Sequence, residues 1–510
     1  MSLSSRTCKR ILFGILFLGV CATGIAQITP RYNTNIPESI MTPDRVDTRL
    51  GPLEFFDGIP TEETAALVYD NLDFLRGVET FLNGIPATSL EGLRRGVISL
   101  GATSANQVVL FDRLMDSNPL FLTGNTDTVY ATAFLDLERD GPTVVEIPAG
   151  AGPGTVNDAY FRFVVDMGAP GPDRGQGGKY LILPPGYEGA VPDGYFTARS
   201  TSFVNWVILR GFLVDGKPDA ANEMWQEGIK IYPLAAAENP PAMEFISGSE
   251  QPFNTIHAND FEFFEELHTV IDREPIEMLD PELRGLFASV GVQKGKPFAP
   301  DERMRTILTE AVAVGNATSR ALFWHERDET NFVYEDSYWK MGFLGGSWEY
   351  LKDGGMGGRN LDARTHFYYF ATVNTPAMTM DIVGAGSQYL WGYLDENGNY
   401  LDGGKSYKLH LPANFPVEEF FSIVLYDPQT RSELQTSQPF PSKNNVRDNL
   451  NMNADGSVDI YLGPTAPAGQ ENNWIQTVPG KGWFSLLRFY SPTEAFFDRS
   501  WQPGEFEELR

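Results

Sequence analysis

The chain has almost no cysteine and no long run of positive charge. Its only two cysteines, Cys8 and Cys21, lie close to the N-terminus. The rest of the chain therefore offers no disulfide scaffold, no thiol nucleophile and no thiolate metal ligand. The formal net charge is −28, with 39 basic and 67 acidic residues. We therefore expect neither nucleic acid nor an anionic membrane surface as a partner.

The N-terminus has the parts of a secretory signal peptide. Three basic residues precede an apolar run at 11–20, and small residues lead to Ala26. The run is too short to span a bilayer, which takes about 20 apolar residues. We expect cleavage near Ala26, which would remove residues 1–26 and leave an exported, periplasmic or secreted protein without a transmembrane segment. The alternative is lipid attachment at Cys21, because the residues before it resemble a lipobox.

Local patterns predict short strands, several helices and many turns. The 50 glycines, 35 prolines and 13% aromatic residues favour such a mixture over a helical bundle. The Asn397-Gly398 pair predicts a tight hairpin between two of the strands. Apolar residues at helical spacing predict helices at 61–82, 90–100, 260–273, 300–321 and 361–371. Aromatic and β-branched runs predict strands at 129–137, 144–148, 160–166, 179–183, 202–213, 389–394, 407–411 and 458–462.

These elements predict an α+β protein of more than one domain. A lead-in at 27–60 precedes an N-terminal domain at 61–215, in which helices accompany a mixed sheet. A mainly helical connecting region follows at 216–358. The spacing of strands and turns in 359–510 predicts a C-terminal antiparallel β-sandwich, jelly-roll-like in its arrangement.

Several motifs, in their order and spacing, resemble those of a known family. In the N-terminal half they are 125–130, Leu135-Asp136-Leu137, Gly141-Pro142, Tyr160, Asp166, Tyr180-Leu181 and Arg210. In the C-terminal half they are 389–394, Leu401-Asp402-Gly403, Tyr407, Asn473-Trp474, 488–492 and Trp501. By these motifs the chain is similar to exported proteins that pair the domain of unknown function 1254 with the domain of unknown function 1214. The resemblance implies an α+β N-terminal domain and a jelly-roll-like C-terminal domain, and it implies no reaction.

The most unusual polar stretch is Asn125-Thr126-Asp127-Thr128-Val129-Tyr130. It places a carboxylate, an amide, hydroxyls and a phenol at the start of a predicted strand. Such a set can bind a polar ligand or position Asp127 as a general base. The alternative is a turn in which Asn125 and Asp127 bond their own backbone before the strand begins.

A second candidate set lies in the predicted sandwich. Aromatic faces stack on sugar rings, while arginine and asparagine supply directed hydrogen bonds. The alternative is a sandwich core in which the arginine bridges buried carbonyls. The candidate ligand-binding residues of this set are Trp391, Asn473, Trp474, Arg488 and Tyr490.

Neither a metal site nor a cofactor is expected. His257, Asp260, Glu265 and His268 lack the spacing of a known metal motif, and an amphipathic helix explains them. The segment 395–402 offers oxygen ligands for calcium, but a polar hairpin explains it as well. No phosphate-binding loop and no nucleophile elbow occurs in the sequence.

Two functions from different classes remain open. The first is non-catalytic binding of a glycan or a small amphiphilic solute, suggested by the aromatic content and the missing catalytic motifs. The alternative is a hydrolase or lyase with Asp127 as acid–base carboxylate, assisted by Tyr130, Arg210 or His268. The sequence leaves the oligomeric state undecided.

Overall fold

The structure is a computed structural model, and it describes residues 32–510. The predicted signal peptide, its cleavage near Ala26 and the alternative anchor at Cys21 lie outside the described residues and stay predictions. Contacts divide the chain into two compact units, Met1–Tyr69 and Asp70–Arg510. Among residues 32–510, no helix combines the length and the apolar character that a membrane span requires.

The first unit contains a small antiparallel sheet and the start of the longest helix. The strands follow one another in the order β1 (Arg45–Thr48), β2 (Gly51–Phe56) and β3 (Ile59–Pro60). Helix α1 (Glu62–Ser99) begins with two acidic residues in its first turn, where they complement the helix dipole.

Helix α1 corrects the prediction of two separate helices at 61–82 and 90–100. It runs through 38 residues with Pro86 inside it. Gly92 and Gly96, which suggested a weak helix, permit a close approach of another backbone segment. A Cβ atom at Gly92 would lie 2.4 Å from the Thr255 carbonyl oxygen, and one at Gly96 would lie 2.7 Å from the Asn254 carbonyl oxygen. Tertiary packing thus explains these glycines, which cost only about 1 kcal/mol each in a helix.

The N-terminal part of the second unit contains two sheets. The short helix α2 (Leu137–Asp140) directly follows the strand that ends at Asp136 in the larger sheet. The larger sheet has the order β13 (Glu244–Ser247), β4 (Gln107–Leu110), β5 (Val129–Asp136), β11 (Val204–Gly211), β7 (Gly154–Asp158) and β8 (Phe163–Met167). The smaller sheet has the order β10 (Phe196–Arg199), β9 (Gly178–Leu183), β6 (Thr143–Ile147) and β12 (Lys230–Pro233).

The strand predicted at 160–166 begins later than its residue types suggest. The Asp158 carboxylate accepts the backbone N–H groups of Tyr160 and Arg162, both at 2.8 Å. Phe161 between them has a φ of 57°, which is incompatible with a strand. A side-chain-capped turn therefore occupies the first part of this segment, and β8 begins at Phe163.

Further helices accompany the N-terminal and C-terminal sheets. Asp280, Asp301 and Asn360 each cap a helix by accepting a backbone N–H of its first turn. The helices are α3 (Asp219–Gly228), α4 (Glu262–Arg273), α5 (Pro281–Ser289), α6 (Glu302–Trp324) and α7 (Leu361–Phe370).

The C-terminal part contains two sheets that share an apolar core, with the short helix α8 (Glu494–Phe497) beside them. This arrangement, together with the N-terminal sheets, confirms the predicted α+β class and the C-terminal antiparallel sheet. The fully antiparallel sheet has the order β14 (Lys340–Met341), β15 (Ser387–Gly392), β21 (Phe484–Pro492), β17 (Val417–Tyr426) and β18 (Ser442–Asn444). The other sheet has the order β20 (Trp474–Gln476), β19 (Val458–Gly463), β16 (Ser406–Leu411) and β22 (Phe506–Leu509).

The hairpin predicted at Asn397-Gly398 forms only as a turn. Leu394 and Tyr400 make an isolated antiparallel bridge around it, and Asp395 caps it by accepting the N–H of Asn399 at 2.8 Å. The flanking strands do not pair with each other, because β15 lies in one sheet and β16 in the other. The turn thus carries the chain from one sheet to the next.

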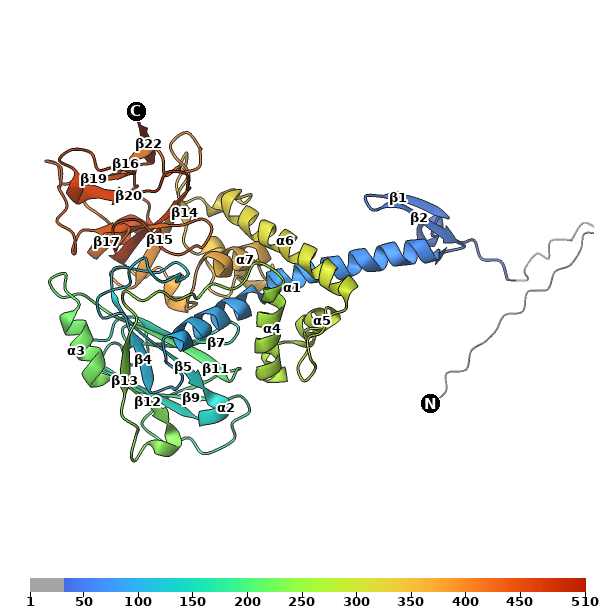
Figure 1. The fold of residues 1–510 in the computed structure, drawn as a ribbon, viewed down its shortest axis with the longest axis horizontal. Coiled ribbons are helices and arrows are strands. Elements are labelled where there is room, and N and C mark those ends of the chain that lie inside the picture. The colour runs from blue at the N-terminus through green and yellow to red at the C-terminus, as the bar shows by residue number, and fades with distance from the viewer. Residues whose placement is uncertain (1–31) are drawn as a thin grey trace, which may run out of the picture. The chain divides into compact units, whose positions relative to one another are not determined.

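One apolar core connects the two parts of the second unit, and the helices and strands of both parts can be followed in Figure 1. The region 216–358, predicted to be a connector, also contributes β12 and β13 to the N-terminal sheets and β14 to the C-terminal one. The predicted boundaries near 215 and 358 stay predictions. The connecting core includes Phe81, Leu90, Ile208, Phe263, Phe323, Phe370, Trp391 and Phe484.

Candidate functional site

The polar stretch before β5 forms a buried turn. Asn125, Thr126, Asp127 and Thr128 are all at most 2% exposed. The Asp127 N–H donates to the Asn125 side-chain oxygen at 2.9 Å, which is the Asx turn considered as the alternative. The Asn125 amide in turn donates to the hydroxyl oxygens of Tyr130 at 2.9 Å and Tyr490 at 2.8 Å. The turn therefore links β5 to the C-terminal sheet.

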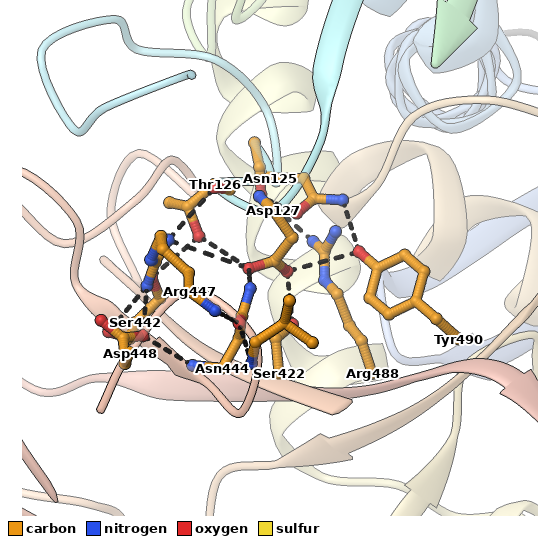
Figure 2. Close-up of polar contacts among 12 residues, drawn as sticks. Asn125, Thr126, Asp127, Ser422, Ser442, Asn444, Arg447, Asp448, Arg488 and Tyr490 are labelled. Carbon is orange, nitrogen blue, oxygen red and sulfur yellow. Dashed lines mark hydrogen bonds and ion pairs between the residues drawn. The ribbon is translucent and has the colours of Figure 1, made fainter. Parts of the chain in front are cut away.

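The Asp127 carboxylate is enclosed by side chains of the C-terminal sheet (Figure 2). One oxygen accepts the hydroxyl of Ser422 on β17 and that of Tyr490 on β21, the latter at 3.3 Å. The other accepts the Asn444 amide of β18 at 3.1 Å and lies 3.9 Å from a guanidinium nitrogen of Arg447. Both oxygens are thus occupied by the protein itself.

This enclosure changes the titration of a neighbouring phenol. Burial and then the negative charge of Asp127 raise the pKa of Tyr490 well above its ordinary value. The phenol therefore stays protonated and donates to Asp127 at neutral pH. The geometry favours a structural connection between the two halves over a carboxylate that faces a substrate.

Beside this network, β5, β11, β15 and β21 surround a small cavity of about 70 Å³. Asn125, Tyr130, Arg210, Trp391 and Arg488 all line it. The structure thus brings together candidates that the sequence assigned to two separate sites. Its other walls are mainly aromatic or apolar and include Phe111, Met115, Phe121, Phe343, Phe367 and Leu486.

A larger cavity of about 650 Å³ adjoins the small one. It reaches the size of typical small-molecule sites, which are about 300–1,000 Å³. Its apolar wall includes Pro153, Pro170, Ala377, Met380, Ile382 and Ala385. The two cavities share the lining residues Ile208, Arg210, Val373, Met378 and Tyr389.

Arg210 and Arg488 lie at the junction of the N-terminal and C-terminal sheets, beside the cavities. Neither has a carboxylate partner within ion-pair distance among residues 32–510. Arg488 is 4% exposed, and its Nη2 donates to the Gly124 carbonyl oxygen at 3.1 Å while its Nε has no partner. The guanidinium carbon of Arg210 lies 5.6 Å from the centre of the Tyr130 ring. Burial opposes ionisation of Tyr389, but the charges of Arg210 and Arg488 outweigh it and lower the pKa of this phenol. The junction is therefore electropositive.

A carboxyl group lies in the larger cavity. Burial raises the pKa of Asp166 to about 6, although hydrogen bonds from Thr375 and Thr155 act against the shift. The Thr375 hydroxyl lies 2.6 and 2.8 Å from the two carboxylate oxygens. Below about pH 6 the Asp166 carboxyl is therefore neutral, and the positive charge of the cavity is not offset.

The other predicted site residues lie elsewhere. Trp474 begins β20 of the second C-terminal sheet, and Asn473 directly precedes it at the end of a short 3-10 helix. The Asn473 amide donates to the carbonyl oxygens of Asn451 and Asp459, both at 2.9 Å. The Trp474 indole donates to the Gly463 carbonyl oxygen at 2.9 Å. They do not line the cavities around Arg488. The sequence placed these residues and Arg488 in one predicted sandwich, but it could not show that they belong to different sheets.

His268 lies on α4, away from the Asp127 network. Its Nε2 pairs with the Lys296 carbonyl oxygen at 2.8 Å, and its ring stacks on Phe298. Residues 32–510 contain no group of three or more acidic, histidine or cysteine side chains that could hold a metal ion.

Sequence reasoning overlooked residues that structure places at the site. Tyr389 and Asp166 lay in motifs that carried the family resemblance, but neither was singled out as a site residue. Ser422, Asn444 and Arg447 carried no signal, because hydroxyl, amide and basic side chains are common on strands and turns. Only the pairing of β17, β18 and β21 brings them to Asp127.

Fold and site together define a two-part α+β protein with an arginine- and tyrosine-rich pocket where the two parts meet. Residues 105–233 match the family model described as protein of unknown function DUF1254. Residues 386–494 match the model described as protein of unknown function DUF1214. The chain therefore carries both domains in the predicted order, and the resemblance is confirmed.

Of two similar solved structures, the first supports the fold alone. The VPA0106 protein from Vibrio parahaemolyticus aligns with a TM-score of 0.53 at 16% identity, covering 86% of this chain and 100% of its own. A protein from Burkholderia cenocepacia aligns with a TM-score of 0.39 at 12% identity, covering 87% of this chain and 96% of its own. No curated protein sequence matches the chain.

Proposed function

We propose that this protein binds a small amphiphilic solute with an anionic head group, without catalysing a reaction on it. The observation that carries the proposal is the position of Arg210 in the walls of both cavities and of Arg488 in the wall of the small one, with no carboxylate within ion-pair distance of either among residues 32–510. A buried guanidinium without a counter-charge favours an anionic ligand that supplies one.

The walls of the larger cavity favour an amphiphile over a glycan. Their side chains are mostly aliphatic, and Met378 and Met380 can adapt to a flexible chain. A sugar would need more polar groups and an aromatic platform along its ring. The predicted sugar-binding partners Asn473 and Trp474 lie on another sheet and cannot complete such a site.

The test is binding of octanesulfonate, a permanent anion with a short alkyl tail, followed by calorimetric titration and thermal shift. We expect octanesulfonate to bind and 1-octanol, its neutral counterpart, to bind much more weakly. Arg210→Gln should weaken octanesulfonate binding by about tenfold or more, because a hydrogen bond to a charged group contributes about 1.5–3 kcal/mol. Ala377→Trp, which fills the larger cavity, should weaken both ligands.

Arg113→Gln is the matched control, since Arg113 is an exposed arginine that pairs with the exposed Glu250 and lines neither cavity. Equal binding by wild type and Arg210→Gln would refute the proposal. So would a 1-octanol affinity equal to that of octanesulfonate.

The predicted alternative, a hydrolase or lyase that uses Asp127, remains a second hypothesis because the Tyr490 hydroxyl lies 3.3 Å from the carboxylate. A structural role instead predicts that Asp127→Ala lowers the free energy of unfolding by about 3 kcal/mol, since Ser422 and Asn444 lose a buried partner. Denaturant unfolding measures this loss, with the exposed Asp193→Ala as control, expected within about 0.5 kcal/mol of wild type. An Asp127→Ala protein of unchanged stability would favour the catalytic hypothesis.

We also propose that the protein is exported to the periplasm or secreted, as the N-terminal sequence predicts. Cell fractionation and N-terminal sequencing of the mature protein test this. A new N-terminus near Gln27 supports cleavage, and a lipid-modified Cys21 would favour the alternative anchor.

A further inference from the structure

A second cavity, of about 360 Å³, lies apart from the proposed amphiphile site. It shares no lining residue with the two cavities around Arg210. Its walls come from α1, β8, the turn before α5, and the segment that leads into and includes α7. Its volume falls in the range of about 300–1,000 Å³ that small-molecule sites occupy.

Four arginines line this cavity, and three of them lack a counter-charge. Arg162 pairs with Asp158 at 2.8 Å. Arg199, Arg359 and Arg364 make no ion pair with any of residues 32–510, and their side chains donate only to neutral oxygens. Such a cluster would repel itself unless an anion or solvent neutralises it.

The acidic residues of the lining do not remove this excess. Asp158 is already engaged by Arg162, the Thr201 hydroxyl and the N–H of Tyr160. Asp280 accepts the Leu283 N–H as the cap of α5. Glu349, the remaining carboxylate, is exposed.

Three buried polar atoms of residues that line this cavity also have no partner. They are the Nε of Arg364, the side-chain oxygen of Asn374 and the hydroxyl of Tyr350, in residues that are 8%, 4% and 2% exposed. An unsatisfied buried polar group costs about 1–3 kcal/mol, so a ligand that supplies partners would recover that free energy. Native proteins keep such groups mainly where they have a function.

Aromatic side chains form the rest of the wall. Tyr160, Phe163, Trp348 and Tyr368 line the cavity, and the rings of Phe163 and Trp348 meet edge to face at 5.5 Å. Trp348 is only half buried, which leaves part of its ring open to a ligand. Aromatic rings beside arginines can hold a planar organic group and its charged substituent together.

We propose that this cavity binds a small organic anion, with its carboxylate or phosphate held by Arg359 and Arg364 and its body against Trp348. The planar guanidinium group can bind either a carboxylate or a phosphate through two parallel hydrogen bonds, so both kinds of anion fit the site. The proposal uses residues that take no part in the proposed amphiphile site, so either proposal can fail alone.

The experiment measures binding of phenyl phosphate and of benzoate to the full chain by calorimetric titration, with benzyl alcohol as the neutral analogue. We expect at least one anion to bind and benzyl alcohol not to bind. Arg359→Gln should weaken anion binding about tenfold or more, because a charged hydrogen bond is lost. Arg359 is exposed, so this variant should keep its fold even if the more buried Arg364→Gln does not.

Two controls separate this site from the other. Arg210→Gln should leave phenyl phosphate and benzoate binding unchanged, and Arg113→Gln should do the same. The absence of binding by both anions at millimolar concentration would overturn the proposal. Equal affinities in wild type and Arg359→Gln would also overturn it.

Discussion

The Asp127 carboxylate is held by side chains from distant parts of the chain. Ser422, Asn444 and Tyr490 lie 295, 317 and 363 residues away from it in sequence. Each supplies a hydrogen-bond donor, so the protein itself provides the polar partners that a buried carboxylate needs in place of water. The network therefore connects the N-terminal and C-terminal sheets through one residue.

At the same scale, Asp166 makes the free energy of unfolding depend on pH. Its pKa rises from 3.8 in the unfolded chain to about 6 in the folded protein. Between these values the folded state binds more protons than the unfolded state, so the free energy of unfolding falls as pH rises from about 4 to about 6. The total loss is about 3 kcal/mol at most.

Asp166→Asn should remove this part of the pH dependence. Urea unfolding of wild type and variant between about pH 4 and pH 7 measures it. The free energy of unfolding of the variant, minus that of the wild type, should therefore increase as the pH rises through this range. Parallel stability curves for the two proteins would contradict the assigned pKa.

At the scale of elements, glycines in helices show two opposite roles. In α1, a Cβ atom at Gly92 would collide with the Thr255 backbone, whereas one at Gly285 in α5 would meet nothing within 4 Å. Helix propensity alone favours alanine over glycine by about 1 kcal/mol at both positions. The atoms around each glycine therefore decide whether a substitution by alanine stabilises or destabilises the protein.

Gly92→Ala should destabilise the protein, since the backbone of 255–257 would have to move away from α1. Overpacking of this kind costs about 1–3 kcal/mol. Gly285→Ala is the matched control and should stabilise the protein by about 0.5–1 kcal/mol. Thermal unfolding compares the two, and a stabilised Gly92→Ala protein would show that the segment is free to shift.

The strands show how far local patterns reach. β5, β9, β11, β15 and β16 lie where aromatic and β-branched runs predicted strands. The same runs could not tell which strands pair, because pairing depends on contacts distant in sequence. For that reason the Asn397-Gly398 turn was predicted correctly while its hairpin was not.

At the scale of the whole molecule, one apolar core joins the N-terminal sheets to the C-terminal sheets within residues 70–510. Aromatic side chains of α6, α7, β15 and β21 meet in it, including Phe323, Phe370, Trp391 and Phe484. If one part unfolded, the apolar side chains that the other part contributes to this core would be exposed to water. We therefore expect the two parts to unfold together.

Calorimetry and tryptophan fluorescence test this expectation. Trp206 and Trp225 report on the N-terminal sheets, and Trp391 and Trp483 report on the C-terminal ones. A single transition, with equal calorimetric and van't Hoff enthalpies for that transition, is expected. Two transitions separated in temperature would show that the parts are independent.

The sequence by itself determined the mixed α+β class, the lack of cysteine after Cys21, the family resemblance and the approximate positions of eight of the 22 strands in residues 32–510. These follow from composition and from periodicities that act over a few residues. Only the tertiary structure decided that Asp127 is enclosed, that Arg210 and Arg488 share a junction with Tyr389, and that Asn473 lies on another sheet. The physical reason is that each of these properties depends on burial and on contacts between residues hundreds of positions apart, which local pattern does not contain.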